Sequence, residues 1–364
     1  MNILFLDQYS EPGGAQLCLQ DLIPEVLRRG WNPRLMVPGD GDLVTWAKKT
    51  GVRTDPLPLG SYTSGKKTAG DLLRFATDLP RMASAVRKVV RRDRVDMVYV
   101  NGPRVLPPVA GLSCPVVFHA HSHVARRVER GLIDWTLRGV AATVVTASEF
   151  VAGPYRRVVN PKRVHVIYNG VADLQSGARD FRRTPVRIGI IGRIAPQKGH
   201  ADFLQAAKQV GGTAEFLIYG SPLFAHAAFE QELRTMARDL PVTFCGWTQD
   251  VGRALQDLEI LAVPSGPDEA ATRVIPEAFS AGTPVVAYRA GGIPEIVEHK
   301  RTGILTESPN AAALAKSLRG LMDDPATMER LSAAGRREWQ RRFRVERFRT
   351  AICDLIESHA RQRY

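Results

Sequence analysis

Two glutamates stand close together in a stretch whose other residues are mostly small or apolar. Glu269 and Glu277 lie in PDEAATRVIPEAFSAGTP, with seven residues between them. If one helix carried both, about 12 Å would separate them along its axis, whereas glycoside hydrolases hold their paired carboxylates roughly 5 to 9.5 Å apart. The spacing therefore does not favour a hydrolase. An ionised carboxylate can accept hydrogen bonds from two adjacent hydroxyls, so the two glutamates suit the two ends of a sugar nucleotide. The alternative is a solvated Glu269 and a Glu277 that only complements a helix dipole.

Two cations follow an apolar run in the second half of the chain. Arg193 and Lys198 stand in GRIAPQKGH and flank a loop that leads into a helix expected at Gly199. Two cations next to a helix N-terminus suit a diphosphate. In glycosyl transfer the diphosphate leaves as negative charge builds on it, and fixed cations can stabilise that charge without a metal. The alternative, two solvated surface charges, is less favoured because both residues follow a strand end.

A pair of glycines and a group of histidines follow strand-like runs in the first half. Gly13 and Gly14 stand in DQYSEPGGAQ directly before a helical pattern, where the backbone can approach an anion. Their spacing is not that of dinucleotide enzymes, and a simple turn is an equal alternative. His119, His121 and His123 alternate in FHAHSH. Because no carboxylate-rich segment accompanies them, one histidine beside a sugar is favoured over a metal cluster.

Short apolar runs must position these residues, and they alternate with helical patterns in both halves of the chain. This alternation predicts an α/β fold with two doubly wound, Rossmann-like parallel-sheet domains. We expect a first domain at 1–171, a linker at 172–185 and a second domain at 186–340, with a final helix at about 341–364 that packs back on the first domain. The expected strands are 3–6, 34–37, 95–100, 116–118, 143–146, 164–167, 187–191, 215–219, 242–244, 258–263 and 284–287.

Composition limits the class of protein and its partners. The chain has 364 residues, 44% of them hydrophobic, and a net charge of +13, which fits two globular domains with an anionic partner. No stretch resembles a membrane span or a secretion signal, so a cytoplasmic location is expected. The four cysteines are scattered, which indicates free thiols and no structural metal. Aromatic residues are few and no reader motif occurs, so nucleic acid is not an expected partner.

The chain resembles the family 4 glycosyltransferases, a group of retaining enzymes with the GT-B fold, in which two Rossmann-like domains face a central cleft. The resemblance runs over nearly the whole length. Its most specific part is EAATRVIPEAFSAGTPVVAYRAGGIPEIV, with the two glutamates of the family pattern, and it is supported by GGAQ, FHAH, TASEF, VIYNGV, GRIAPQKG and FCGW.

The resemblance implies a role for each of these residues. Glu277 would bind the ribose hydroxyls, Glu269 would face the donor sugar, and Arg193 with Lys198 would hold the diphosphate. The remaining implied substrate contacts are Gly13 and Gly14 at the diphosphate, His119 at the sugar with His121 as the second choice, Gly246 of FCGW, and Thr272 with Arg273 beside the first glutamate. Catalytic roles would fall to His119, Glu269, Arg193 and Lys198, and no metal or other cofactor is implied.

One departure from the family pattern affects sugar preference. Many members carry Phe-Gly after the first glutamate, where this chain has Ala271 and Thr272. The resemblance implies a nucleotide diphosphate hexose as donor, and this departure leaves the identity of the hexose open.

The acceptor is a hydroxyl, and two classes of molecule could supply it. A basic helix at 71–94 fits a lipid-linked acceptor at an anionic membrane, where the protein would be peripheral, while a solvated charged face and a soluble natural-product acceptor are alternatives. A sugar-nucleotide epimerase and a basic module that binds nucleotides or nucleic acid are less favoured alternatives.

Overall fold

The computed structural model describes residues 1–11, 13–60, 69–175, 179–222 and 227–361. Residues 176–178 of the expected linker and 362–364 of the expected final helix lie outside this part. The chain divides into two compact units, Met1–Asn169 with Val345–Tyr364, and Gly170–Arg344. The division falls close to the expected ends of the first and second domains at 171 and 340. Each unit is an α/β structure built on one parallel sheet, as predicted.

The first unit contains a sheet of seven described strands in the order β3-β2-β1-β4-β5-β6-β7, with every neighbouring pair parallel. The strands are β1 (Asn2–Asp7), β2 (Asn32–Val37), β3 (Arg53–Pro56), β4 (Met97–Asn101), β5 (Val116–Ala120), β6 (Ala142–Thr146) and β7 (Val164–Val166). The central strands β4, β5 and β6 are buried at every position. Their runs are therefore continuous and apolar, as in sheets covered on both faces.

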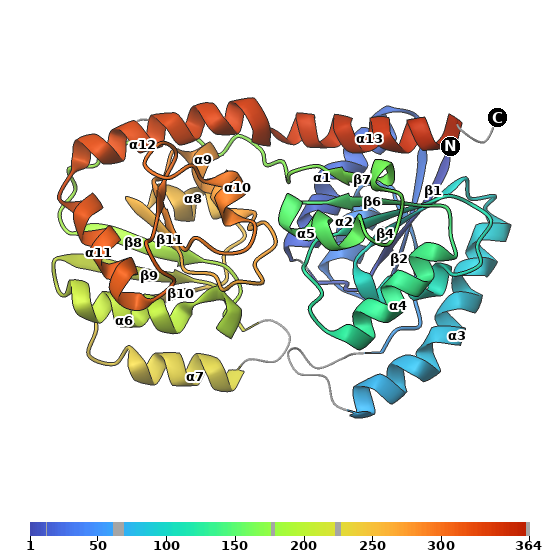
Figure 1. The fold of residues 1–364 in the computed structure, drawn as a ribbon, viewed down its shortest axis with the longest axis horizontal. Coiled ribbons are helices and arrows are strands. Elements are labelled where there is room, and N and C mark those ends of the chain that lie inside the picture. The colour runs from blue at the N-terminus through green and yellow to red at the C-terminus, as the bar shows by residue number, and fades with distance from the viewer. Residues whose placement is uncertain (12, 61–68, 176–178, 223–226, 362–364) are drawn as a thin grey trace. The chain divides into compact units, whose positions relative to one another are not determined.

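Six described helices complete the first unit (Figure 1). They are α1 (Gly14–Arg28), α2 (Asp42–Lys49), α3 (Ala69–Arg92), α4 (Arg127–Arg138), α5 (Glu149–Tyr155) and α13 (Val345–Arg361). The C-terminal helix α13 lies along α1 and adds Phe348, Ile352 and Ile356 to the core that α1 shares with the sheet. Arg29 at the end of α1 also pairs with Asp354 of α13 at 2.6 Å.

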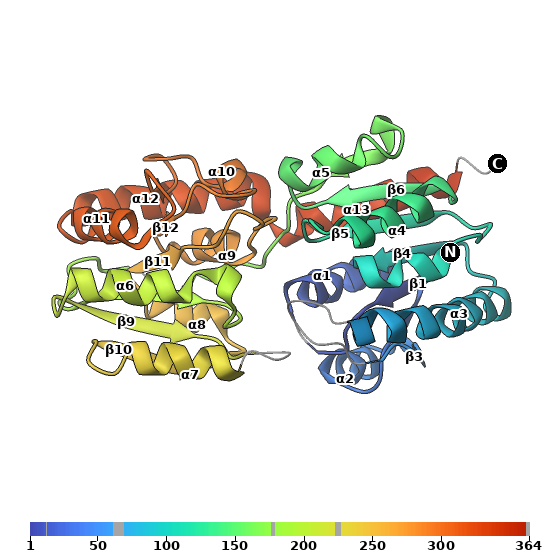
Figure 2. The same cartoon turned by 60° about the horizontal axis from the view of Figure 1, so that its bottom comes forward.

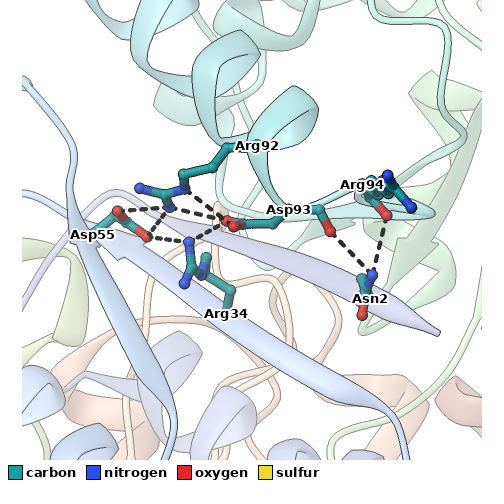
Figure 3. A network of polar contacts seen from close by, with 6 residues as sticks. All are labelled: Asn2, Arg34, Asp55, Arg92, Asp93 and Arg94. Carbon is teal, nitrogen blue, oxygen red and sulfur yellow. Dashed lines mark hydrogen bonds and ion pairs between the residues drawn. The ribbon is translucent and has the colours of Figure 1, made fainter.

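A polar network joins the C-terminal end of α3 to the sheet (Figure 3). Arg92 contacts Asp55 of β3 at 3.0 Å, and Asp55 contacts Arg34 of β2 at 3.2 Å. Arg34 also pairs with Asp93, and the Asn2 side chain donates to the Asp93 carbonyl at 3.0 Å. Because Arg92 is shared between two carboxylates, its charge is offset within the unit.

The second unit contains a sheet of six described strands in the order β10-β9-β8-β11-β12-β13, again all parallel. The strands are β8 (Val186–Ile191), β9 (Ala214–Tyr219), β10 (Val242–Gly246), β11 (Ile260–Val263), β12 (Val285–Ala287) and β13 (Ile304–Leu305). The described helices are α6 (His200–Val210), α7 (Ala227–Met236), α8 (Val251–Gln256), α9 (Val274–Ala281), α10 (Ile293–Ile296), α11 (Ala311–Met322) and α12 (Pro325–Glu338).

Helices of the second unit pack in two groups. Helix α6 contacts α7 and α11, while α9 contacts α8 and α12. Both views place α7 beside the edge strand β10 (Figures 1 and 2), where the Arg234 guanidinium lies 4.4 Å from the centre of the Phe244 ring. Residues 172–175 of the expected linker bind to this unit, with Ser280 of α9 donating to the Ala172 carbonyl at 2.7 Å.

Both sheets have the strand order of a doubly wound nucleotide-binding fold. In each, the first strand pairs with the second along the chain on one side and with the fourth on the other. The order in which the chain adds strands to the sheet therefore changes sense between β1 and β4, and between β8 and β11. In open parallel sheets, ligands bind outside the carboxyl ends of the strands at such a switch point.

Candidate functional site

An ion pair occupies the switch point of the second unit. Lys198 follows β8 and Glu269 follows β11, and Lys198 Nζ lies 2.7 Å from Glu269 Oε2. Their side chains are 27% and 12% exposed. Two predicted residues 71 positions apart in the chain are thus joined at the place where a ligand is expected.

The charge of Glu269 is maintained by its neighbours. Burial alone would raise the pKa of Glu269, but the charge and hydrogen bond of Lys198, a hydrogen bond from Ser265 and the charge of Arg193 together hold that pKa below its ordinary value. At neutral pH this carboxylate is therefore an acceptor that hydroxyl groups can approach. Arg193 is half-buried and makes no hydrogen bond within the described ranges, which leaves its guanidinium donors available.

Close backbone contacts hold the three loops of this cluster together. Gly199, at the start of α6, has φ +76°, and a Cβ atom there would lie 1.9 Å from the Pro264 carbonyl oxygen. On the other side, the Gly292 N–H donates to the Glu269 carbonyl at 2.9 Å. The Gly266 N–H donates to the Gln197 carbonyl, also at 2.9 Å. The loop after β11 is thus fixed between the loops that follow β8 and β12.

The second glutamate lies in the first turn of α9. Glu277 is 8% exposed, and its Oε1 accepts a hydrogen bond of 2.8 Å from Arg273 Nε. Arg273 also donates to the Gly170 carbonyl at 3.3 Å. Glu269 precedes this helix, so the two glutamates do not share one. Thr272, next to Arg273, is 6% exposed.

The predicted glycine of FCGW lies at the carboxyl end of β10. The Gly246 carbonyl accepts a hydrogen bond of 2.8 Å from the Gly220 N–H, which follows β9. Trp247, the next residue, is 43% exposed. Gly246 therefore stands at the same edge of the sheet as the ion pair.

A second polar cluster occupies the switch point of the first unit, and its central residues were not predicted. Asp7 ends β1 and Asn101 ends β4, and Asn101 Nδ2 donates to Asp7 Oδ2 at 2.5 Å. Gln16 of α1 donates to Asp7 Oδ1 at 2.7 Å. Burial raises the pKa of Asp7 to about 6, against the lowering effect of its hydrogen bonds with Asn101, Tyr9 and Gln16.

The predicted glycines lie beside this cluster. Gly13 caps α1 and Gly14 is its first residue. The Gly13 carbonyl accepts from the Leu17 N–H at 2.9 Å. Among the described residues, no side-chain cap bonds this end of the helix, so its first N–H groups are available to an anion.

The two candidate histidines differ in exposure. His119 is 1% exposed, and its Nδ1 lies 2.6 Å from the Tyr99 hydroxyl. His121 is half-buried, and its Nε2 lies 2.7 Å from Asn101 Oδ1. The centres of the two rings lie 3.7 Å apart, and the ring planes are tilted by 36°. Of the two, His121 is the one that a ligand can reach without displacing core side chains.

His123 stands apart from this pair, with its ring 5.1 Å from that of Phe150. Within the described ranges, no three His, Cys, Asp or Glu residues lie in an arrangement that could hold a metal ion. None of the helices in the same ranges is both long and apolar enough to cross a membrane.

Asp7 and Asn101 carry a signal in the sequence that could have identified them. Each is the first polar residue after an apolar run, ILFL and MVYV respectively. Ser265 follows ILAVP in the same way. Strand ends next to a switch point are the positions where such residues meet a ligand.

Comparisons with known proteins agree with this architecture. The family model "Glycosyltransferase Family 4" matches residues 12–173, and "Glycosyl transferases group 1" matches residues 185–324. A crystal structure of HepE from Anabaena in complex with UDP and glucose superposes with a TM-score of 0.83 and 23% identity, over 98% of this chain and 100% of that one. Two Rossmann-like domains of this kind constitute the GT-B fold.

Curated relatives point to the same group of proteins. The lipopolysaccharide core biosynthesis glycosyltransferase LpsD of Rhizobium meliloti is 31% identical over 51% of this chain and 52% of its own length. The phosphatidyl-myo-inositol mannosyltransferase of Mycobacterium leprae is 25% identical over 90% of this chain and 88% of its own. The chain spans about half the length of LpsD and of several other curated relatives that it matches. With both family models matched in sequence order, the chain belongs to the family 4 glycosyltransferases.

Proposed function

We propose that the protein transfers a hexose from a nucleotide diphosphate sugar to a hydroxyl acceptor, with retention of the anomeric configuration. The observation that carries this proposal is the cluster of Lys198, Arg193 and Glu269 at the switch point of β8 and β11. Two cations and a carboxylate there match the two ends of a diphosphate sugar.

Each residue of the cluster has a distinct role in this proposal. Arg193 and Lys198 neutralise the diphosphate as the bond to the sugar breaks and charge grows on the leaving oxygen. Glu269 accepts hydrogen bonds from sugar hydroxyls, and Glu277, oriented by Arg273, accepts them from the ribose. Since the two cations can perform the charge neutralisation, we propose that turnover requires no metal.

For the histidine at the transferred sugar, we choose His121 over His119. The His119 side chain lies within the core, whereas the His121 ring is half-buried next to the Asp7 and Asn101 cluster. Retention follows from a front-face transfer, in which the leaving phosphate takes the proton of the acceptor hydroxyl on the same face of the sugar.

A thermal-shift panel with UDP, GDP, ADP and dTDP in EDTA tests the donor site. One nucleotide at about 100 times its Kd should add about 2.7 kcal/mol to the stability of the folded state. Glu277→Gln should weaken this binding by roughly tenfold or more, because it loses a charged acceptor. Glu298→Gln, which changes an exposed glutamate paired with Arg301, is the matched control.

Two results would count against the donor site. One is the absence of a shift with every nucleotide, and the other is an equal loss in both variants. NMR of the product sugar tests retention, since an inverted anomeric centre would contradict that part of the proposal.

For the acceptor, we propose a lipid-linked hydroxyl compound used by a peripheral protein on the cytoplasmic face of an anionic membrane. The support is the row of exposed cations on α3, together with Leu73 at 69% exposure, and Trp135 and Val128 of α4 at 61% and 75%. Basic and aromatic groups of this kind bind anionic lipid surfaces. The protein should sediment with vesicles of phosphatidylglycerol and not with vesicles of phosphatidylcholine. If it sediments with neither kind of vesicle, a soluble acceptor is favoured.

A further inference from the structure

A chain of side-chain hydrogen bonds crosses three neighbouring strands of the first unit. It runs from Asp7 on β1 to Asn101 on β4 over 2.5 Å, and from Asn101 to His121, just beyond β5, over 2.7 Å. Asp7 and Asn101 are 0% and 1% exposed. Buried polar groups of this kind are costly unless each bond is made in the correct sense, so the direction of every bond in the chain can be determined.

The orientation of the Asn101 amide follows from the groups around it. Its Nδ2 faces two acceptors, Asp7 Oδ2 and the Ala15 carbonyl at 3.1 Å. The opposite orientation would direct the amide oxygen at both of these oxygens and leave it without a donor. The Asn101 Oδ1 atom must therefore face His121 Nε2, and an amide oxygen can only accept. His121 consequently carries its proton on Nε2.

This assignment determines what the other ring nitrogen can do. Burial lowers the pKa of His121 to about 3, so the ring is neutral at physiological pH. A neutral imidazole protonated on Nε2 has a bare lone pair on Nδ1. Among the described residues, none donates a hydrogen bond to this nitrogen, and the ring is half-buried. The His121 Nδ1 atom is thus an acceptor available to a ligand.

We propose that Asp7 and Asn101 are positioning residues that hold His121 in the Nε2–H form, so that Nδ1 accepts a hydrogen bond from a hydroxyl of a bound sugar substrate. The identity of the ligand rests on the proposed function, whereas the form of the ring does not. An acceptor-only group at the same place, such as the carboxylate of a uronic acid, would meet the lone pair and be disfavoured. The arrangement therefore selects sugars by the presence of a hydrogen-bond donor.

Asp7→Asn separates this role from a purely structural one. The amide of the variant has one oxygen, which should remain with the two donors at the Asp7 Oδ1 position, Gln16 and the Tyr9 N–H. Its NH2 group then meets the NH2 group of Asn101, and relief of this conflict turns the Asn101 amide over. In that arrangement Asn101 donates to His121 Nε2, and the ring proton moves to Nδ1.

The test is NMR of protein labelled with 15N-histidine, because a protonated and a bare ring nitrogen have well separated 15N shifts. The His121 signals are identified by their loss in His121→Gln. We expect protonated Nε2 and bare Nδ1 in the unmodified protein, and a population with protonated Nδ1 in Asp7→Asn. Asp78→Asn, at a buried aspartate that accepts from the Gly60 N–H, is the control and should leave the spectrum unchanged.

Kinetics locate the hydroxyl. Asp7→Asn should lower kcat/KM by about tenfold without lowering the melting temperature. If the hydroxyl belongs to the transferred sugar, the KM for the donor should change. If the hydroxyl belongs to the acceptor, the KM for the acceptor should change instead. A proton on Nδ1 in the unmodified protein, or unchanged ring protonation and kinetics in Asp7→Asn, would overturn the inference. The expected tautomer without turnover of any nucleotide sugar would count against the proposed function instead.

Discussion

Replacing Lys198 with methionine should separate the stability of the candidate site from its affinity for nucleotide. The substitution keeps an unbranched side chain but removes the cation that lies 2.7 Å from Glu269 Oε2. It leaves the carboxylate, which is 12% exposed, with Ser265 and Arg193 as its remaining partners.

The magnitude follows from the burial of the pair. Loss of one partner of a fully buried ion pair costs about 3–5 kcal/mol, because the other charge stays buried without compensation. Lys198 is 27% exposed, so solvent already offsets part of the interaction and we expect a loss of about 2 kcal/mol. In the double variant Lys198→Met/Glu269→Gln no uncompensated carboxylate remains, and stability should return to within about 1 kcal/mol of the original protein.

Urea unfolding measures these differences, with each transition fitted separately because the chain forms two units. Lys316→Met is the matched control, since Lys316 and Glu307 form a pair whose side chains are 72% and 80% exposed. The control should change stability by less than about 0.5 kcal/mol. Nucleotide binding, measured by calorimetry, should be weakened in both Lys198 variants.

Two results would refute this reasoning. If Lys198→Met is as stable as the control, the pair does not maintain the charge of Glu269. If the double variant recovers nucleotide affinity together with stability, Lys198 only supports the fold and does not contact the diphosphate.

Three further predictions concern stability. Gly199→Ala should lower the free energy of unfolding, measured with urea, by more than about 2 kcal/mol, roughly the scale of backbone strain plus a steric overlap. The reason is that its Cβ would lie 1.9 Å from the Pro264 oxygen. Gly211 is also at positive φ but has no atom within 4 Å of the Cβ position, so Gly211→Ala should cost about 1 kcal/mol. Since the pKa of Asp7 is raised from 3.8 to about 6, its ionisation should lower stability by up to about 3 kcal/mol as pH rises through this range, and Asp7→Asn should abolish that loss. The hydrogen bond with Arg28 lowers the pKa of Glu25 from 4.5 to about 2, against the effect of burial. Glu25→Gln should therefore be less stable than the original protein by about 1 kcal/mol at pH 7. This difference in stability should vanish as pH falls from 4.5 toward 2, and an unchanged difference at low pH would contradict the prediction.

The sequence predicts the sheets well where the strands are buried on both faces. Continuous apolar runs such as those of β4 and β5 indicate their strands directly, and their alternation with helices predicts two doubly wound units. Strand β3 was not predicted, because its residues, RTDP, are partly or fully exposed at one edge of the sheet. Strand β13 has only two residues, too few for a periodic pattern.

The site was predicted unevenly, for a physical reason. Lys198 and Glu269 could be selected as candidates because each stands in a charged motif at an expected strand end, and the fold joins the two side chains. Which histidine is the more exposed could not be predicted, because residues two positions apart on a strand share one face. The exposure of His119 and His121 therefore depends on where β5 ends, and the sequence does not define that end to one residue. Asp7 and Asn101 gain their meaning only from the pairing of β1 with β4, which is a property of topology and not of local sequence.

The central claim is that the second unit binds a nucleotide through its diphosphate, and calorimetric titration of Arg193→Met tests it most directly. Arg193 makes no hydrogen bond within the described ranges, so its loss should leave the fold intact. The nucleoside diphosphate that shifts the melting temperature should bind the original protein at least about tenfold more tightly than its monophosphate, as one further charge-assisted contact allows. This preference should largely disappear in Arg193→Met. Equal affinity for diphosphate and monophosphate in the original protein, or an unchanged preference in the variant, would contradict the account.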